Sequence, residues 1–190
     1  MAFNKPAPAG RAVWLHAVNA LLLAGLWAFA LLAYGDLPDR IPGHIGPRGV
    51  TRWESRDGGV WFLLPIMASL HVLLVYVLSA VVAEGGPGVN IPGKRRLERL
   101  PPEGRRYALR PMRTFMYGLA AWLLLLMGFI QYIIYRAAMT AAAGEPDTSG
   151  VFTGILIFLA LFAWAVYRAT RSVHDRAAAW EAGEAPSEET

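Results

Sequence analysis

No cysteine occurs among the 190 residues of the chain. This absence excludes disulfide bonds, thiolate metal sites and thiol nucleophiles, and it leaves the redox compartment undecided. Charge is also scarce, because Asp, Glu, Lys and Arg make up 17% of the chain, against about 25% in a typical soluble domain. Hydrophobic residues reach 55%. The composition is therefore not that of an ordinary soluble domain.

The chain contains several long apolar segments. Residues 12–34 contain no Asp, Glu, Lys or Arg. A helix needs about 20 such residues to cross a hydrocarbon core of about 30 Å. The apolar part of a signal peptide has only about 7–15 residues, so we expect this stretch to stay in the mature protein. Similar stretches follow at about 59–83, 114–135 and 151–167.

The distribution of Lys and Arg predicts the orientation of these spans. Two such residues lie in 1–11, eight in 84–113 and three in 168–190; four lie in 35–58 and none in 137–150, with Arg136 at that edge. Short loops rich in Lys and Arg stay in the cytoplasm. We therefore predict an all-α integral membrane protein, a bundle of four transmembrane helices with both termini inside and a short Pro/Gly-rich outer loop. Its membrane domain covers 12–167, between cytoplasmic tails at 1–11 and 168–190, and its predicted location is the bacterial cytoplasmic (inner) membrane.

The basic residues lie beside apolar spans, which favours the membrane surface over nucleic acid as their partner. The expected partner is a bilayer with anionic headgroups, with a membrane-protein partner or a second copy left open. The residues expected to touch the headgroups are Lys94, Arg95, Arg96, Arg99, Arg105 and Arg106.

Polar residues inside the predicted spans are expensive in hydrocarbon and are functional candidates for that reason. They are His16, Asn19, His71 and Gln131. The structural interpretation is that these residues form hydrogen bonds between helices, with His71 bonded to a backbone carbonyl or to Asn19. A haem between His16 and His71 is not predicted, because the two would lie about 6 and 18 Å deep at 1.5 Å per residue. No cofactor and no metal is predicted.

The spans contain no carboxylate, which argues against a proton-coupled transporter or an intramembrane aspartyl protease. The HExxH metalloprotease motif is absent, and no Gly-Lys-Ser/Thr follows the glycines of 85–88. We therefore expect a protein that is not an enzyme.

The segment 37–53 stands apart because Pro42, Gly43, Gly46 and Pro47 forbid a helix and favour consecutive turns. One histidine with irregularly spaced carboxylates is a weak metal signal, and we do not predict a metal there. The structural interpretation is that Asp39 pairs with Arg40 and that the His44 ring bonds to backbone. The functional interpretation is an outer recognition loop carried by Pro38, Asp39, Arg40, Pro42, His44, Gly49 and Trp53.

The pattern Leu-Pro-x-x-Ile-Pro-x-His at 37–44, followed by Gly49 and Arg56, resembles a bacterial membrane domain of unknown function, family 1648. That domain forms the amino-terminal part of Sdp-type immunity proteins. The resemblance covers about residues 12–136, but Ile45 and Gly46 replace the family's usual aromatic and Asn. It implies membership of a membrane family and, by extension from one branch, an immunity-type role.

Three function hypotheses follow. The leading one is a non-enzymatic inner-membrane accessory, sensing or immunity-type protein with an outward-facing recognition loop. The alternative is a structural subunit or assembly factor of a larger membrane protein complex. The third is a small enzyme or transporter that uses His44 or His71.

Overall fold

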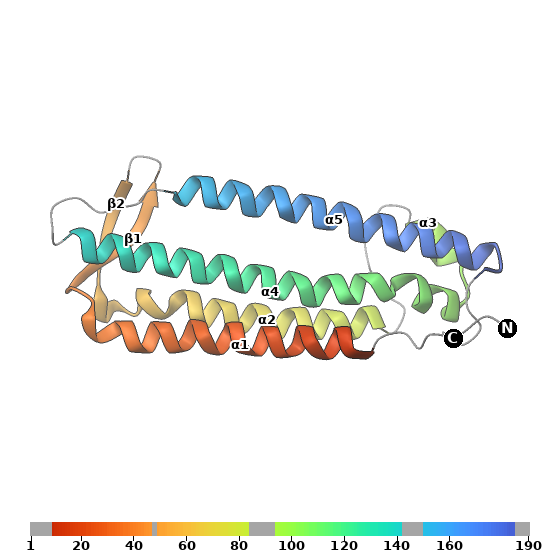
Figure 1. Cartoon of the computed structure of the whole chain (residues 1–190), viewed down its shortest axis with the longest axis horizontal. Coiled ribbons are helices and arrows are strands. Elements are labelled where there is room, and N and C mark those ends of the chain that lie inside the picture. The colour runs from red at the N-terminus through yellow and green to blue at the C-terminus, as the bar shows by residue number, and fades with distance from the viewer. Residues whose placement is uncertain (1–8, 47–48, 84–93, 142–149, 185–190) are drawn as a thin grey trace. The chain divides into compact units, whose positions relative to one another are not determined.

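The structure is a computed structural model that describes residues 9–46, 49–83, 94–141 and 150–184. It is mostly helical (Figure 1). Four helices are long and apolar enough to cross a membrane, and they are α1 Ala9–Ala33, α2 Leu63–Ala83, α4 Pro102–Ala141 and α5 Val151–Glu181. This count and this apolar character suggest an integral, multi-pass membrane protein.

Two of the helices begin where proline is tolerated. Pro65 lies in the first turn of α2 and Pro102 is the first residue of α4. Neither position would supply an amide hydrogen to the helix, so the ring does no harm there. Pro111 lies inside α4, where its missing amide leaves one carbonyl of the preceding turn without its usual partner.

The region 84–113 was predicted as a loop, and the structure corrects this from residue 94 onward. Lys94–Arg99 forms the short helix α3, and α4 starts at Pro102. α4 has 40 residues, about 60 Å at 1.5 Å per residue, which is twice the thickness of a hydrocarbon core. Its charged first turns therefore extend beyond the apolar part. α5 likewise continues to Glu181, through residues predicted as a tail.

The loop after α1 corrects the all-α prediction. It contains an antiparallel β-hairpin of β1 Arg40–Gly46 and β2 Gly49–Ser55, shown at one end of α1 in Figure 1. The 3₁₀ turns η1 Tyr34–Asp36, η2 Arg56–Gly58 and η3 Val60–Phe62 link it to the helices. The prolines allow strands here because a two-stranded sheet consists of edges, where proline removes no ladder bond that the fold needs.

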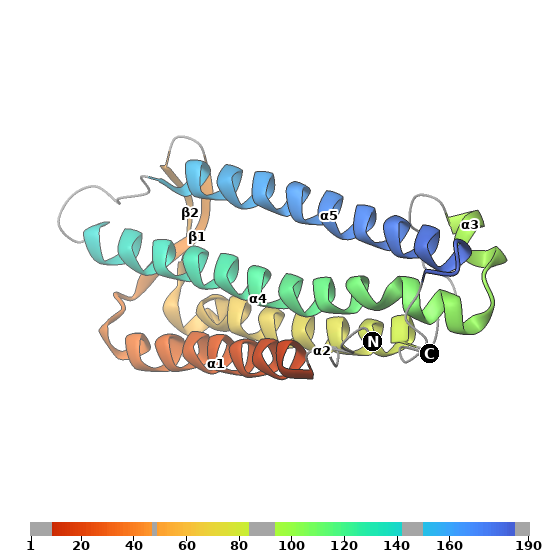
Figure 2. The ribbon, with the colours of Figure 1, turned by 45° about the vertical axis from the view of Figure 1, so that its right-hand side comes forward.

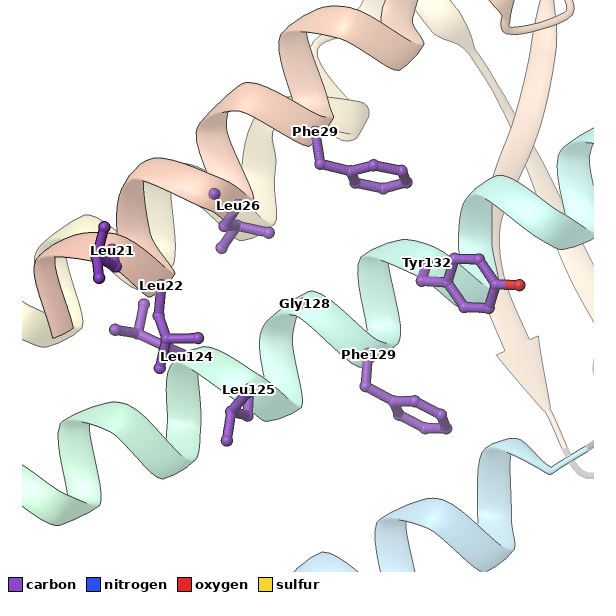
Figure 3. A pocket seen from close by; sticks show the side chains of 10 residues that line it. Leu21, Leu22, Leu26, Phe29, Leu124, Leu125, Gly128, Phe129 and Tyr132 are labelled. Atoms are coloured by element: carbon purple, nitrogen blue, oxygen red, sulfur yellow. The ribbon is translucent and has the colours of Figure 1, made fainter. Parts of the chain in front are cut away.

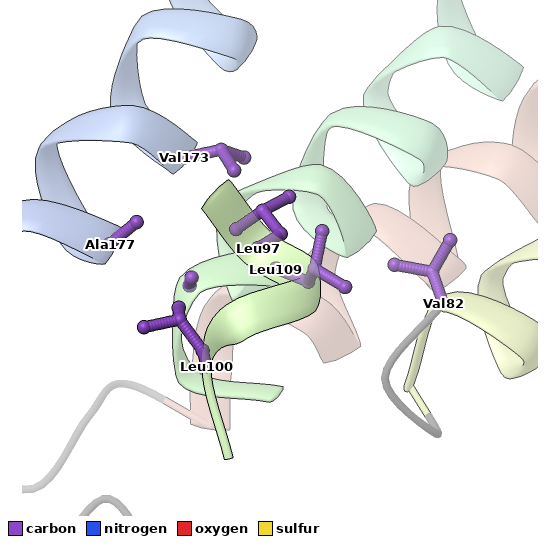
Figure 4. Close-up of a cluster of buried hydrophobic side chains, with 7 residues drawn as sticks. Val82, Leu97, Leu100, Leu109, Val173 and Ala177 are labelled. Atoms are coloured by element: carbon purple, nitrogen blue, oxygen red, sulfur yellow. The ribbon is translucent and has the colours of Figure 1, made fainter. Parts of the chain in front are cut away.

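The chain forms two compact units. Unit 1 comprises residues 1–16, 73–120 and 161–190, and unit 2 comprises 17–72 and 121–160. The core of unit 1 joins Val82, Leu97, Leu100, Ala108, Leu109, Val173 and Ala177 (Figure 4). In Figures 1 and 2, α3 lies beside the carboxyl end of α5 within this unit. Unit 2 has two clusters, one centred on Leu26, Ala68 and Leu124 and one beneath the hairpin.

Candidate functional site

The hairpin in unit 2 is irregular at its centre. Arg40 pairs with Ser55, Pro42 with Trp53, His44 with Arg52 and Ile45 with Val50. The register shifts between Pro42 and His44 and again between His44 and Ile45. Such bulges bend a strand and increase its twist, which re-aims the side chains beside them. His44 therefore stands between two bulges.

Gly43 occupies the first of these irregular positions because nothing larger fits. A β-carbon built on Gly43 would run into the Cγ of Glu54 on the opposite strand. Glycine is the residue that permits a close approach of this kind. The glycine that looked like turn chemistry in the sequence is thus a requirement of strand pairing.

The underside of the hairpin is fixed by an apolar cluster. Leu37 and Ile41 are buried together with Trp61, and the cluster also contains Ala30, Ala33 and Ala138. These residues come from the end of α1, the hairpin, η3 and α4. The Leu-x-x-x-Ile spacing of the sequence motif therefore serves packing between the hairpin and the helix ends.

Trp61 and Gln131 add directional bonds to this cluster. The indole Nε1 of Trp61 donates to the carbonyl of Ala30 at 2.7 Å. The amide Nε2 of Gln131 on α4 donates to the carbonyl of Trp61 at 3.0 Å. Gln131 is almost fully buried, and its Oε1 has no hydrogen-bond partner among the described residues. This chain of bonds links α1, η3 and α4 at the base of the hairpin.

Arg56 closes the open end of the hairpin. Its Nη1 donates to the carbonyl of Leu37 at 2.7 Å, and its backbone amide donates to the carbonyl of Asp39 at 2.9 Å. The guanidinium also lies 3.5 Å from Asp57 and 5.5 Å from the centre of the Tyr34 ring. The Tyr34 hydroxyl donates to Asp57 at 2.9 Å. Hydrogen bonds from a charged donor are among the stronger ones in proteins, so Arg56 holds the two ends of the loop together.

The upper side of the hairpin presents charged and polar groups. Asp39, Arg40, His44 and Arg52 are exposed, while Pro38, Gly49 and Trp53 are half-buried. The His44 Nδ1 lies 2.6 Å from the Thr51 hydroxyl. Arg52 pairs with Glu54 at 2.9 Å. The exposed set can exchange hydrogen bonds and charge with a partner while the backbone beneath it stays fixed.

Three local predictions for this loop need correction. Asp39 lies 3.8 Å from Arg56, which is the ion pair that the structure gives it in place of the predicted pair with Arg40. The His44 Nδ1 bonds to the Thr51 side chain, where a backbone partner was predicted. Pro42, predicted in the recognition surface, is fully buried and has no side-chain surface left for a partner. Each correction depends on strand register, which the sequence does not display.

Sequence reasoning missed the residues that hold the site in place. Arg56 was noted only as part of a family pattern, and Tyr34, Asp57 and Trp61 were not among the residues of the predicted recognition loop. An aromatic residue on each side of a Pro/Gly-rich segment, with a basic residue just before the next apolar run, is the signal that could have found them. Such residues are candidates for closing a loop at a membrane surface.

The predicted intramembrane polar residues have different surroundings. Asn19 is buried, as is Gln131. His71 is half-buried, and its Nε2 has no hydrogen-bond partner among the described residues, so the predicted bond to a carbonyl or to Asn19 does not involve this atom. An unpredicted bond joins Trp27 to Ser69 at 3.0 Å, between α1 and α2.

In unit 1, His16 belongs to a small polar and aromatic cluster. Its Nδ1 lies 2.7 Å from the Tyr76 hydroxyl, and its ring meets the Tyr117 ring edge-on at 4.5 Å. Ser79 donates to the Tyr117 hydroxyl at 3.1 Å. The cluster gives each of these polar groups a partner within the protein, as a low-dielectric environment requires. This is the kind of interhelical bonding that the sequence predicted for polar residues within the spans, and it includes His16.

An apolar groove of about 350 Å³ lies between α1 and α4 in unit 2 (Figure 3). The Tyr132 hydroxyl is the one polar side-chain group in its lining. The lining residues are Leu21, Leu22, Gly25, Leu26, Phe29, Leu124, Leu125, Gly128, Phe129 and Tyr132. Ligand pockets usually add several placed polar groups to an apolar wall, and these residues do not supply them. Within the described part of the chain, no three His, Asp or Glu side chains gather in a group able to hold a metal ion.

The site coincides with a known sequence family. Residues 21–68 match the family described as "Domain of unknown function (DUF1648)".

The match covers residues 21–68 of the 190 in the chain.

The domain contains most of α1, the hairpin, the Arg56 clip and the first turns of α2. It therefore includes the residues that hold the hairpin in place, apart from Gln131 and Ala138 of α4. An uncharacterised protein of Archaeoglobus fulgidus is 27% identical over 150 residues, which cover 75% of this chain and 77% of that protein. No solved structure matches the chain. Neither match names an immunity protein.

Proposed function

We propose that this protein is a non-enzymatic membrane protein of the accessory, sensing or immunity type. In this proposal the hairpin of the DUF1648 domain faces outward from the cytoplasmic membrane and recognises a partner. One observation supports it above the others. The hairpin is anchored from below by Leu37, Ile41 and Trp61, yet its opposite side carries exposed Asp39, Arg40 and His44. Rigid support beneath exposed polar groups is what a recognition surface requires.

The absence of cysteine makes the proposed orientation directly testable. Arg52→Cys places a single thiol on the hairpin, and Glu103→Cys places one in the first turn of α4, both at exposed positions. A membrane-impermeant maleimide added to intact cells should label the first variant and not the second. Both should react after the membrane is opened. Labelling of Glu103→Cys in intact cells would contradict the proposed topology.

Recognition itself is tested by photo-crosslinking in native membranes. A photoreactive amino acid at Arg52 on the hairpin should form a discrete adduct, which the additional change His44→Ala should abolish. The same photoreactive amino acid at Trp164, an exposed position on α5, serves as the comparison. Amide exchange of residues 40–55 in His44→Ala should stay unchanged, which separates lost recognition from a lost fold. Adducts from Trp164 and none from Arg52 would contradict the proposal and support the alternative, a subunit that packs through its helices.

A further inference from the structure

Unit 1 contains a basic region that the proposed function does not use. We call it the headpiece, defined as residues 94–113 and 168–181. α3, the first turns of α4 and the last turns of α5 contribute to it. Leu97 and Leu100 are buried with Leu109, Val173 and Ala177, as Figure 4 shows. The apolar cluster means that the headpiece is folded, so its charges have defined positions.

Part of the basic charge is engaged inside the headpiece. Arg96 and Glu181 form a forked pair with a shortest distance of 2.6 Å. Arg176 lies 4.3 Å from the centre of the Tyr107 ring, and Lys94 lies 3.6 Å from Glu98. These side chains join α3 and α4 to α5 or support α3 itself. Lys94 and Arg96, both predicted to touch lipid, therefore also have ion-pair partners within the headpiece.

Four other arginines remain open. Arg95, Arg99, Arg106 and Arg113 are exposed, and none forms an ion pair within the described part of the chain, although the charge of Arg99 also acts on Glu181. Arg95 and Arg99 are one turn apart on α3, while Arg106 and Arg113 are two turns apart on α4. Arg113 was absent from the residues predicted to touch lipid. The structure thus separates the basic residues that build the headpiece from those that it presents.

The position of these arginines relative to the apolar part of α4 identifies their partner. Arg113 and Arg136 are the charged residues that bound the apolar stretch of α4. They are 23 positions apart, which is about 35 Å along a helix and matches a hydrocarbon core of about 30 Å. In a bilayer crossed by this stretch, Arg113 would lie at the level of the headgroups and Arg106 about two turns beyond it along α4.

We infer that Arg95, Arg99, Arg106 and Arg113 form a surface that binds anionic phospholipid headgroups. Guanidinium groups distributed over two helices suit a two-dimensional array of phosphates. A site for a single soluble anion would instead bring these groups together on one point. The surface therefore retains anionic lipids around the headpiece.

The test uses the full chain in nanodiscs of mixed phosphatidylcholine and phosphatidylglycerol. Native mass spectrometry counts the phosphatidylglycerol molecules that stay bound after release. The variant Arg95→Gln/Arg106→Gln should lower the apparent affinity by about fivefold for each arginine removed. Arg95→Lys/Arg106→Lys should restore binding, because the attraction depends on charge.

The matched control is Arg40→Gln/Arg52→Gln, which removes the same charge from exposed positions on the hairpin. It should retain more phosphatidylglycerol than the headpiece variant. Equal retention by both variants, or no loss in the headpiece variant, would overturn the inference. Inorganic phosphate at constant ionic strength should not displace the lipid; displacement would show a site for free phosphate instead. Circular dichroism of each variant confirms that the helices are intact.

Discussion

The indole of Trp61 donates a hydrogen bond of 2.7 Å to the carbonyl of Ala30, which lies 31 residues earlier in the chain. Ala30 is the fourth residue from the end of α1, and the last four carbonyl groups of a helix lack partners within it. Trp61 therefore completes the end of α1 and packs beneath the hairpin at the same time. One side chain couples the membrane helix to the candidate recognition element.

Truncating Trp61 should destabilise unit 2. Trp61→Ala removes a side chain that is 1% exposed, and we expect a loss of about 3–5 kcal/mol. Trp61→Phe keeps most of the packing but leaves the Ala30 carbonyl without its donor, so we expect a loss of about 1–2 kcal/mol. Unfolding in mixed detergent micelles, followed by circular dichroism, measures both. The control Trp164→Phe, at a side chain that is 61% exposed, should change little.

Replacing Arg56 should loosen the hairpin without unfolding the helices. Lysine keeps the charge but cannot reach the Leu37 carbonyl and Asp57 with a planar fork. Loss of a hydrogen bond from a charged donor is expected to speed amide exchange in 40–55 by about tenfold. Hydrogen exchange with mass spectrometry measures this rate in Arg56→Lys. Arg40→Lys, at an exposed position, should exchange like the parent protein; an equal acceleration there would contradict the role of Arg56.

Two glycines of α4 should respond to alanine in opposite directions. A β-carbon at Gly104 would lie 2.5 Å from the indole nitrogen of Trp180, whereas one at Gly118 would meet nothing within 4 Å. Alanine normally stabilises a helix interior relative to glycine by about 0.5–1 kcal/mol. We expect this gain for Gly118→Ala and a net loss of about 1–3 kcal/mol for Gly104→Ala, through overpacking. Thermal unfolding of the two variants in detergent compares them directly.

The headpiece should weaken at acidic pH through Glu181. Hydrogen bonding to Arg96 lowers the pKa of Glu181 from its ordinary value of 4.5, with a further contribution from the charge of Arg99. Because the folded-state pKa is the lower one, the stabilisation is complete above the unfolded-state pKa and is lost as pH falls through the folded-state pKa. Both side chains are exposed and screened, so the change should be small.

Amide exchange of residues 94–99, measured between pH 6 and pH 3 and corrected for intrinsic rates, tests this. Exchange in the parent protein should rise at the acidic end. In Glu181→Gln the protection of α3 should be lower at neutral pH and should lose this pH dependence. An unchanged pH profile in Glu181→Gln would show that the pair contributes nothing.

The membrane helices could be predicted from the sequence because their signal is local. A run such as 12–34, which has no charged residue, favours a non-aqueous environment whatever the rest of the chain does. The four helices long enough to span a membrane coincide with such runs. The ends of α4 and α5 could not be predicted in this way. Their polar turns are helical because Leu97, Leu109 and Val173 bury one another, and that packing joins segments distant in the chain.

In the hairpin, too, the conformation and burial of single residues depend on contacts that the local sequence does not reveal. Turn-forming residues such as Pro42 are locally compatible with turns or with an edge strand, and only the pairing of Ile41 with Glu54 and of Pro42 with Trp53 selects the strand. The same pairing buries Pro42 and leaves His44 exposed. The register therefore decides which of these two side chains is buried and which is exposed.

The sequence by itself determined that this is a chain with four apolar spans, no thiol chemistry and a DUF1648 motif between the first two spans. These properties depend on composition and on neighbours in the chain, because transfer of each side chain into hydrocarbon is decided locally. The tertiary structure alone decided which polar side chains form hydrogen bonds or ion pairs within the protein. Arg56 is fixed on Leu37 and Arg96 on Glu181, while Arg95 and Arg106 stay open, because hydrogen bonds and ion pairs form between residues brought together by folding.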